Sequence, residues 1–287
     1  MKNLLFAFAL LMSFQAFAQD NDNSFNPYFQ FEVGKTYYLL GDNVNLRAKA
    51  DIKGEVVAKL PIGTAVKIEV VEETKDMVLN GLNAPWCKVS FSDKGANKTA
   101  YLWAGFLSLN ALESESDKNV KFLFGIAKIT QKKEKDYSYD EVTMQIRVCN
   151  SNKEIQKIEF DGRGSITTAR SGEIYHKKGV ASVESIINIE YSDNYCGGSF
   201  GNHIFFWDAK KLYFVKNLQS GADAPCFSSE DFIYPNDEGG KAGHILMKAE
   251  GGCTGEESDE IEYSERSMTE YVWKNNKLEE VKKYDIK

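Results

Sequence analysis

Proline, histidine and long apolar runs are all scarce in this 287-residue sequence. Only 5 prolines accompany a 43% hydrophobic composition, so most of the chain can bury a core and little of it is expected to be disordered. After residue 18 no apolar run approaches the ~18 residues that a membrane-spanning helix needs. No dense basic run occurs, and 35 Lys and Arg stand against 42 Asp and Glu. A net acidic surface repels phosphate backbones, so we expect no nucleic-acid partner.

Sequence signatures of metal and nucleophile chemistry are also missing. The three histidines, His176, His203 and His244, form neither a His-x-His pair nor a His-Glu-x-x-His set. No two cysteines have the C-x-x-C spacing of zinc and thioredoxin-type sites, and no Gly-x-Ser-x-Gly elbow occurs. The sequence therefore predicts no metal site, no cofactor and no catalytic residue.

The first 18 residues have the layout of a secretory signal peptide. Lys2 gives a positive start, residues 4–14 are almost wholly apolar, and Ala16-Phe17-Ala18 forms a small-x-small cleavage site before Gln19. This run is too short to cross a bilayer core of about 30 Å, and no cysteine follows the cleavage site to carry a lipid anchor. We predict an exported mature chain, periplasmic or secreted, that does not span a membrane once residues 1–18 are removed.

Five cysteines would enter the oxidising compartment that export implies. Cys87 and Cys149 lie in strand-like apolar runs and are expected to be small core residues. The other three, Cys196, Cys226 and Cys253, lie in segments that contain Gly and Ser. We expect one disulfide among these three, and the odd count leaves at least one thiol that does not pair within the chain.

The pattern along the chain predicts two all-β regions. Residues 19–34 are expected to be a flexible leader and residues 35–110 a first domain of short strands. Residues 111–119 are polar and lack aromatics, so they are predicted to be a linker. Residues 120–287 then form a second, larger antiparallel domain, either a sandwich or barrel-like.

Alternation with period two is the main signal in the second region. Three sets of apolar residues each share one face of a half-buried strand: Val120, Phe122, Phe124 and Ile126; Val142, Met144, Ile146 and Val148; Ile187, Ile189 and Tyr191. Residues 204–207 are apolar on both faces, which is typical of a central strand. Trp207 to Leu212 and Trp273 to Leu278 have the same spacing, which predicts two hairpins with Trp entering and Leu leaving the turn.

Residues 35–109 resemble the bacterial SH3 domain (SH3b) family. The similar segments are Val44-Asn45-Leu46-Arg47-Ala48, Gly54, Val56-Val57, Leu60-Pro61-Ile62-Gly63-Thr64, the alternating Val66, Ile68 and Val70, Trp86-Cys87-Lys88-Val89, Ala100-Tyr101-Leu102 and Phe106-Leu107. Two departures stand out. Ala50-Asp51 occupies the place of a frequent family proline, and the segment from Val70 to Trp86 is longer than usual, with an exposed loop expected over residues 75–85.

The SH3b resemblance implies a small barrel that binds a ligand, since such modules target cell walls or peptides and often accompany enzymes that cut peptidoglycan. Aromatic side chains in a groove between loops give large contact area at low entropic cost. The candidates are Tyr37, Tyr38, Tyr101 and Trp103, each of which has barrel core as its plainer alternative. Trp86 is expected in the core.

A cysteine hydrolase is the enzyme alternative that the resemblance raises. Residues 196–203 bring Cys196, Asn202 and His203 together. Such chemistry usually needs the cysteine at a helix start and the histidine on a distant strand, whereas here a Gly-rich segment leads directly into the strand at residues 204–207. The segment is therefore predicted to be a plain turn.

Three functions from different classes follow. The favoured one is a non-enzymatic binding protein of the bacterial envelope, whose partner is peptidoglycan or an envelope protein or peptide. The second is a structural or assembly subunit that acts through protein contacts of the β-domain. The least favoured is a cell-wall hydrolase using Cys196 and His203. The sequence leaves the oligomeric state open.

Overall fold

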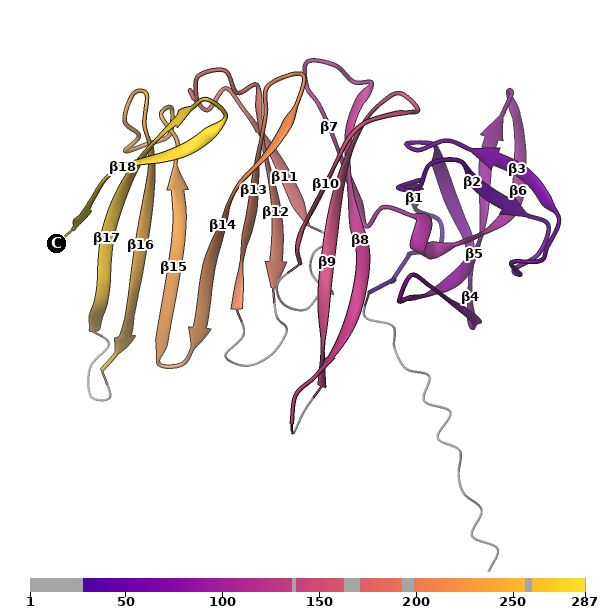
Figure 1. Cartoon of the computed structure of the whole chain (residues 1–287), viewed down its shortest axis with the longest axis horizontal. Helices are drawn as coiled ribbons and strands as arrows, with labels where there is room; N and C mark the ends of the chain where they lie inside the picture. The colour runs from indigo at the N-terminus through magenta and orange to yellow at the C-terminus, as the bar shows by residue number, and fades with distance from the viewer. Residues whose placement is uncertain (1–27, 136–137, 163–170, 193–198, 256–259, 287) are drawn as a thin grey trace, which may run out of the picture.

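The computed structural model describes residues 28–135, 138–162, 171–192, 199–255 and 260–286 (Figure 1). Strands dominate these residues, and one short 3₁₀ helix, η1 (Ala104–Phe106), is the only helical element among them. The predicted all-β class is confirmed. The expected signal peptide and Cys196 lie outside the described residues.

The N-terminal region is a six-stranded sheet with the order β1-β4-β5-β6-β2-β3. A single bridge, Leu39 to Leu107, links its first strand to the segment after η1. In the described residues β3 pairs only with β2, so the sheet is curled but not closed into a barrel. The strands are β1 (Thr36–Tyr38), β2 (Val44–Arg47), β3 (Val56–Leu60), β4 (Ala65–Leu79), β5 (Leu82–Asp93) and β6 (Ala96–Trp103).

The long segment between Val70 and Trp86 is a hairpin rather than the loop expected over residues 75–85. Strands β4 and β5 continue to a two-residue turn at Asn80-Gly81, whose φ angles are 54° and 77°. Asn and Gly tolerate positive φ, and the turn they form has the twist that antiparallel strands need. The extra length therefore extends the β4–β5 hairpin.

A four-stranded sheet follows, with the order β10-β9-β8-β7. Its strands are β7 (Asn110–Glu113), β8 (Val120–Lys133), β9 (Ser138–Asn150) and β10 (Lys153–Asp161). Strand β7 occupies the start of the expected linker 111–119 and pairs with β8 from Asn110–Phe124 to Glu113–Lys121. The polar composition of this segment reflects an edge strand and its turn, not a spacer.

The end of the expected leader is also part of the fold. Phe29 and Phe31 are 4% and 8% exposed and belong to the main hydrophobic core. Phe31 meets Tyr37 edge to face at 4.8 Å. Burial of these apolar side chains therefore holds residues 28–34 in place. The sequence did not predict this, because the residues just before them are polar.

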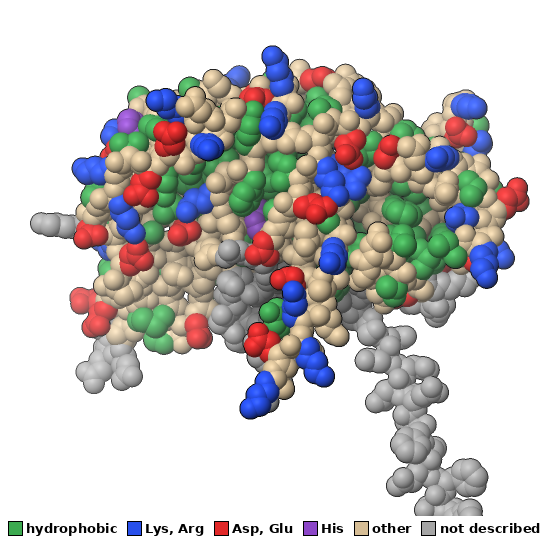
Figure 2. Space-filling model, viewed as in Figure 1, with side chains coloured by type: hydrophobic (Ala, Val, Ile, Leu, Met, Phe, Trp, Pro, Cys, Tyr) green, Lys and Arg blue, Asp and Glu red, His purple; other side chains and the backbone are tan. Residues whose placement is uncertain are grey.

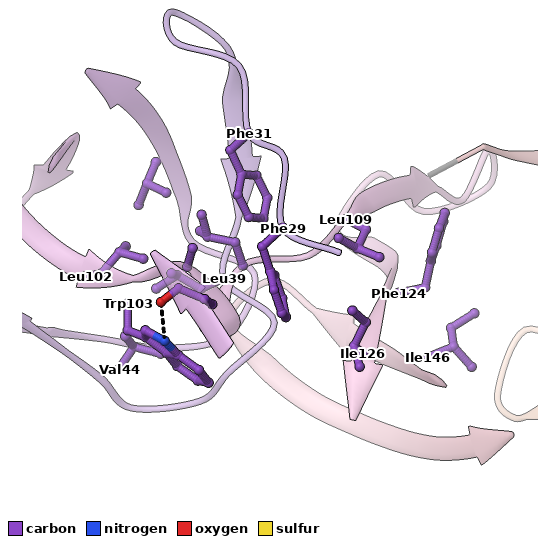
Figure 3. Close-up of a cluster of buried hydrophobic side chains, with 14 of the residues drawn as sticks. Phe29, Phe31, Leu39, Val44, Leu102, Trp103, Leu109, Phe124, Ile126 and Ile146 are labelled. Atoms are coloured by element: carbon purple, nitrogen blue, oxygen red, sulfur yellow. Dashed lines mark hydrogen bonds between the residues drawn. The ribbon is translucent and has the colours of Figure 1, made fainter. Parts of the chain in front are cut away.

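The six- and four-stranded sheets meet backbone to backbone. At Gly63 (φ +75°) an added Cβ would lie 2.8 Å from the Ser151 carbonyl oxygen, and at Gly81 it would lie 2.6 Å from that of Ile129. Asn152 Nδ2 donates to the Ile62 carbonyl oxygen (3.1 Å) and to Thr64 Oγ1 (3.2 Å). The hydrophobic core continues without a break across this joint (Figure 3). The two sheets are therefore in direct contact at this place and share one core.

We expect Gly81→Ala to destabilise the protein more than Gly95→Ala. Both glycines are in hairpin turns at similar φ (+77° and +81°), so each substitution carries the strain of positive φ, on the order of 1 kcal/mol. Only at Gly81 does the new methyl group strike a neighbouring backbone, because nothing lies within 4 Å of the Gly95 position. Urea unfolding of the two variants measures the difference, and equal midpoints would show that the joint is loose.

The C-terminal region is an eight-stranded sheet in which each strand pairs with the next in sequence. The ladder is thin at one place: β14 and β15 share only three residue pairs, from Gly221–Ser228 to Asp223–Cys226. The strands are β11 (Gly172–His176), β12 (Ser185–Ser192), β13 (Ser199–Trp207), β14 (Leu212–Asp223), β15 (Cys226–Ile233), β16 (Ile245–Thr254), β17 (Ile261–Lys274) and β18 (Lys277–Asp285).

Strand β13 has apolar side chains on both faces, as its sequence predicts. Phe205 and Trp207 pack toward the four-stranded sheet, where Trp207 meets Phe122 edge to face at 5.4 Å. Phe206 points into a second cluster on the other face and meets Trp273 at 4.9 Å. The two predicted Trp-to-Leu hairpins are confirmed, because Trp207 pairs with Leu212 and Trp273 with Leu278.

Candidate functional site

The four aromatic residues singled out in the sequence are not gathered at one place. Tyr37 and Tyr38 are half-buried and line a cavity of about 300 Å³ between β1 and β7. Tyr101 is half-buried on β6, paired with Arg47. Trp103 is only 3% exposed and lies at the end of β6, beside the joint between the two sheets. Only Trp103 borders the largest groove described below.

A groove of about 380 Å³ lies where the six-stranded sheet meets the four-stranded sheet. A smaller cavity of about 150 Å³ borders it, and the two share Asp42, Trp103 and Phe106. The groove is bounded by the β4–β5 turn and η1 on one side and by β8, β9 and β10 on the other. We call the two together the joint groove; its further lining used below comprises Leu40, Leu82, Ile126, Gln145, Arg147 and Lys157, with Ile52 in the smaller part.

The floor of the joint groove is apolar and fixed. Trp103 Nε1 donates to the carbonyl oxygens of Met77 (2.9 Å) and Ala84 (3.0 Å), and Figure 3 draws a hydrogen bond from this indole. Phe106 meets the Trp103 ring edge to face at 5.1 Å. Gly105 lies directly against that ring, since an added Cβ would come within 2.2 Å of it. The indole is therefore satisfied and presents apolar surface only.

The far wall of the joint groove carries charge. Arg147 on β9 and Lys157 on β10 are direct cross-strand partners, and Asp42 lies on the side of the six-stranded sheet. Figure 2 shows hydrophobic side chains over the N-terminal sheet, with basic and acidic side chains over the neighbouring strands. The groove thus combines apolar side chains on its floor with a charged wall, in which Arg147 pairs with Glu154 and Lys157 with Glu159.

The buried Gln145 holds the arginine in place. Its side chain is 7% exposed, and its Nε2 donates to the Ile126 carbonyl oxygen (3.0 Å) beside a register shift in β8. Its Oε1 accepts from Arg147 Nε (2.8 Å), and Arg147 Nη1 donates to Glu154 (3.0 Å). Sequence reasoning missed this set, because Gln145 and Arg147 alternate with apolar residues as any wet face of a strand does.

Of the cysteine–histidine pair considered for catalysis, the structure describes only the histidine, which is not accessible to solvent. His203 is 2% exposed and its ring lies 4.8 Å from both Phe160 and Tyr191. Cys196 is outside the described residues. An imidazole enclosed by aromatic rings is positioned as a core side chain.

Cys226 and Cys253 form a disulfide between directly paired residues of β15 and β16. Cys87 and Cys149 are buried free thiols. Burial, with a smaller contribution from Glu72, raises the pKa of the Cys87 thiol to about 12, and burial also raises the pKa of Cys149. Neither forms a thiolate near neutral pH, so both are structural residues.

A serine, a histidine and a glutamate that the sequence did not suggest lie together beside β11. Ser185 Oγ is 3.0 Å from His176 Nδ1, and Glu115 Oε2 is 3.8 Å from the same nitrogen. In a catalytic triad the acid and the hydroxyl contact different nitrogens of the ring. Ser185 is also 1% exposed, which keeps a substrate away from its hydroxyl. This set joins the segment after β7 to the eight-stranded sheet.

In the described part of the chain no group of three or more His, Cys, Asp or Glu side chains is arranged to hold a metal ion. No helix in that part is long and apolar enough to cross a membrane.

Comparisons with family models, with curated proteins and with solved structures find no match to this chain.

Proposed function

We propose that the protein is an exported, non-enzymatic binding protein of the bacterial envelope and that it binds peptidoglycan in the joint groove. The observation that carries the proposal is the groove itself, with its apolar floor at Trp103 and Phe106 and its basic wall at Arg147 and Lys157. The N-terminal signal pattern and the SH3b resemblance support the envelope and the cell wall as location and ligand. The favoured alternative ligand is a peptide of another envelope protein.

The construction of the site supports binding rather than turnover. The indole nitrogen of Trp103 and the guanidinium of Arg147 are already hydrogen-bonded, and the two sheets meet through close backbone contacts. A preformed groove loses little entropy when a ligand enters, which favours affinity. Peptidoglycan combines apolar alanyl and carboxylate groups in an extended polymer, and the two connected parts of the groove offer room for a portion of one of its units.

We expect Ile52→Ser to weaken binding of the mature protein to purified sacculi about tenfold, and Ile261→Ser to leave it unchanged. Ile52 lines the smaller part of the joint groove and is 54% exposed, so a ligand covers it without refolding of the protein. Covering such a side chain contributes roughly 1.5 kcal/mol, about a tenfold change in affinity.

Pelleting with sacculi over a range of protein concentrations gives the half-saturating value for each protein. Ile261 is the matched control, because it is a 42% exposed isoleucine on β17, outside the lining of the groove. Failure of the wild-type protein to pellet would overturn the proposed function. If Ile52→Ser and Ile261→Ser weaken binding to sacculi equally, the peptidoglycan site does not lie in the joint groove.

A further inference from the structure

We propose that the joint groove recognises a carboxylate of the peptide part of its ligand, held between Arg147 and Lys157, and not the glycan strand. This inference rests on the proposed function and names the chemical group that the basic wall takes. Its starting point is the direct opposition of two positive side chains on neighbouring strands.

Opposition of like charges in an antiparallel pair destabilises the sheet. Here it results from a register shift between Glu154 and Gln156 in β10. The pairing Cys149–Glu154 before the shift would place Gln156 opposite Arg147, whereas the pairing after the shift places Lys157 there. Bulges that re-aim side chains are frequent next to functional sites. The bulge thus brings a second cation to the wall of the groove.

The arginine is held in one orientation by two side chains. Gln145 and Glu154 occupy its Nε and Nη1, which fixes the plane of the guanidinium. Its Nη2 has no hydrogen-bond partner in the described residues and its side chain is 19% exposed. Lys157 pairs with Glu159 at its own strand edge and keeps 37% of its side chain exposed. A ligand oxygen between the two would receive charge-assisted hydrogen bonds from both.

The remaining chemistry of the groove favours a peptide carboxylate over a sugar. The Trp103 ring is only 3% exposed, too little to stack on a pyranose, and the aliphatic side chains of Leu40, Leu82 and Ile126 beside it are equally buried. Asp42 on the other side faces the groove with the opposite charge, so a peptide with both an amine and a carboxylate is complementary to both walls.

The test compares intact sacculi with sacculi whose carboxylates have been converted to amides by carbodiimide and ammonia. We expect the wild-type protein to bind the amidated sacculi about tenfold more weakly, the change typical of losing one charge-assisted contact. Arg147→Gln should weaken binding to intact sacculi by a similar factor and reduce the response to amidation, with Lys157 retaining part of that response. Arg147→Lys should restore only part of the affinity, because an ammonium cannot reproduce the planar fork.

Lys157→Gln should also weaken binding, and Lys153→Gln is its matched control. Lys153 is an exposed lysine at the start of the same strand and does not line the groove. Thermal unfolding of each variant shows that it remains folded. Equal binding of wild-type protein to intact and amidated sacculi would overturn this inference while leaving the proposed function in place. Absence of binding to both would overturn the function, and the inference with it.

Discussion

Phe122→Ala is expected to destabilise the protein by about 3–5 kcal/mol, the range for truncation of a fully buried aromatic side chain. Phe122 is 0% exposed and lies on β8, where the four-stranded sheet packs against the eight-stranded one. Its ring meets that of Trp207 edge to face at 5.4 Å, so truncation removes an aromatic contact as well as leaving a cavity. The urea midpoint should fall accordingly.

Phe200→Ala is the control for this prediction. Phe200 is a phenylalanine on β13 but is 41% exposed, so its truncation should change the unfolding free energy by less than about 0.5 kcal/mol. If the two variants unfold at the same urea concentration, the packing of the sheets through Phe122 does not contribute to stability. A second, separate transition in the Phe122→Ala protein would instead show that the sheets unfold independently.

Reduction of the Cys226–Cys253 disulfide is expected to cost about 3–4 kcal/mol. The two cysteines are 27 residues apart in sequence, and cross-linking a loop of that length removes conformational freedom from the unfolded chain by about this amount. The bond joins β15 to β16 at the end that lies away from the loop between them, next to the thin β14–β15 junction. Unfolding of this half of the sheet should become easier on reduction.

The measurement is thermal unfolding with and without a reducing agent, repeated on the Cys226→Ala, Cys253→Ala double variant. The double variant should resemble the reduced wild-type protein and should not respond to reduction. Cys87 and Cys149 are already thiols and do not contribute to the difference. A double variant that still loses stability on reduction would assign the effect to another cysteine.

The period-two alternation in the second region correctly predicted strands, but the expectation of one solvated face was wrong for β8 and β12, which bury residues on both faces. Phe122, Phe124 and Ile126 recur with period two and are fully or almost fully buried, although Leu123 between them is buried as well, in a separate cluster. The two Trp-to-Leu hairpins were predictable for a local reason as well, since Asn275 and Asn276 accept positive φ (53° and 61°) in the second turn. Local pattern and turn chemistry therefore predict elements whose partners are near in sequence.

The linker and the joint groove were not predictable, because both depend on contacts between distant segments. Residues 110–113 form a strand only when β8 lies beside them, and their composition carries no sign of it. Arg147 and Lys157 lie opposite each other only because of the bulge in β10, which periodicity does not reveal. Trp103 was singled out as an aromatic, but its place in the groove follows from the position of β8.

The six-stranded and eight-stranded sheets have different strand orders, and this difference affects how fast each sheet is expected to fold. In the eight-stranded sheet every strand pairs with its neighbour in sequence, so each hairpin closes a short loop. In the six-stranded sheet Arg47 on β2 has to find Tyr101 on β6. Long-range pairing of this kind slows folding, because the chain loses conformational entropy in closing the loop before the paired strands contribute any stabilising contacts. The C-terminal meander is therefore expected to form rapidly, one hairpin after another, and the N-terminal sheet to complete last, so that the groove exists only in the finished molecule.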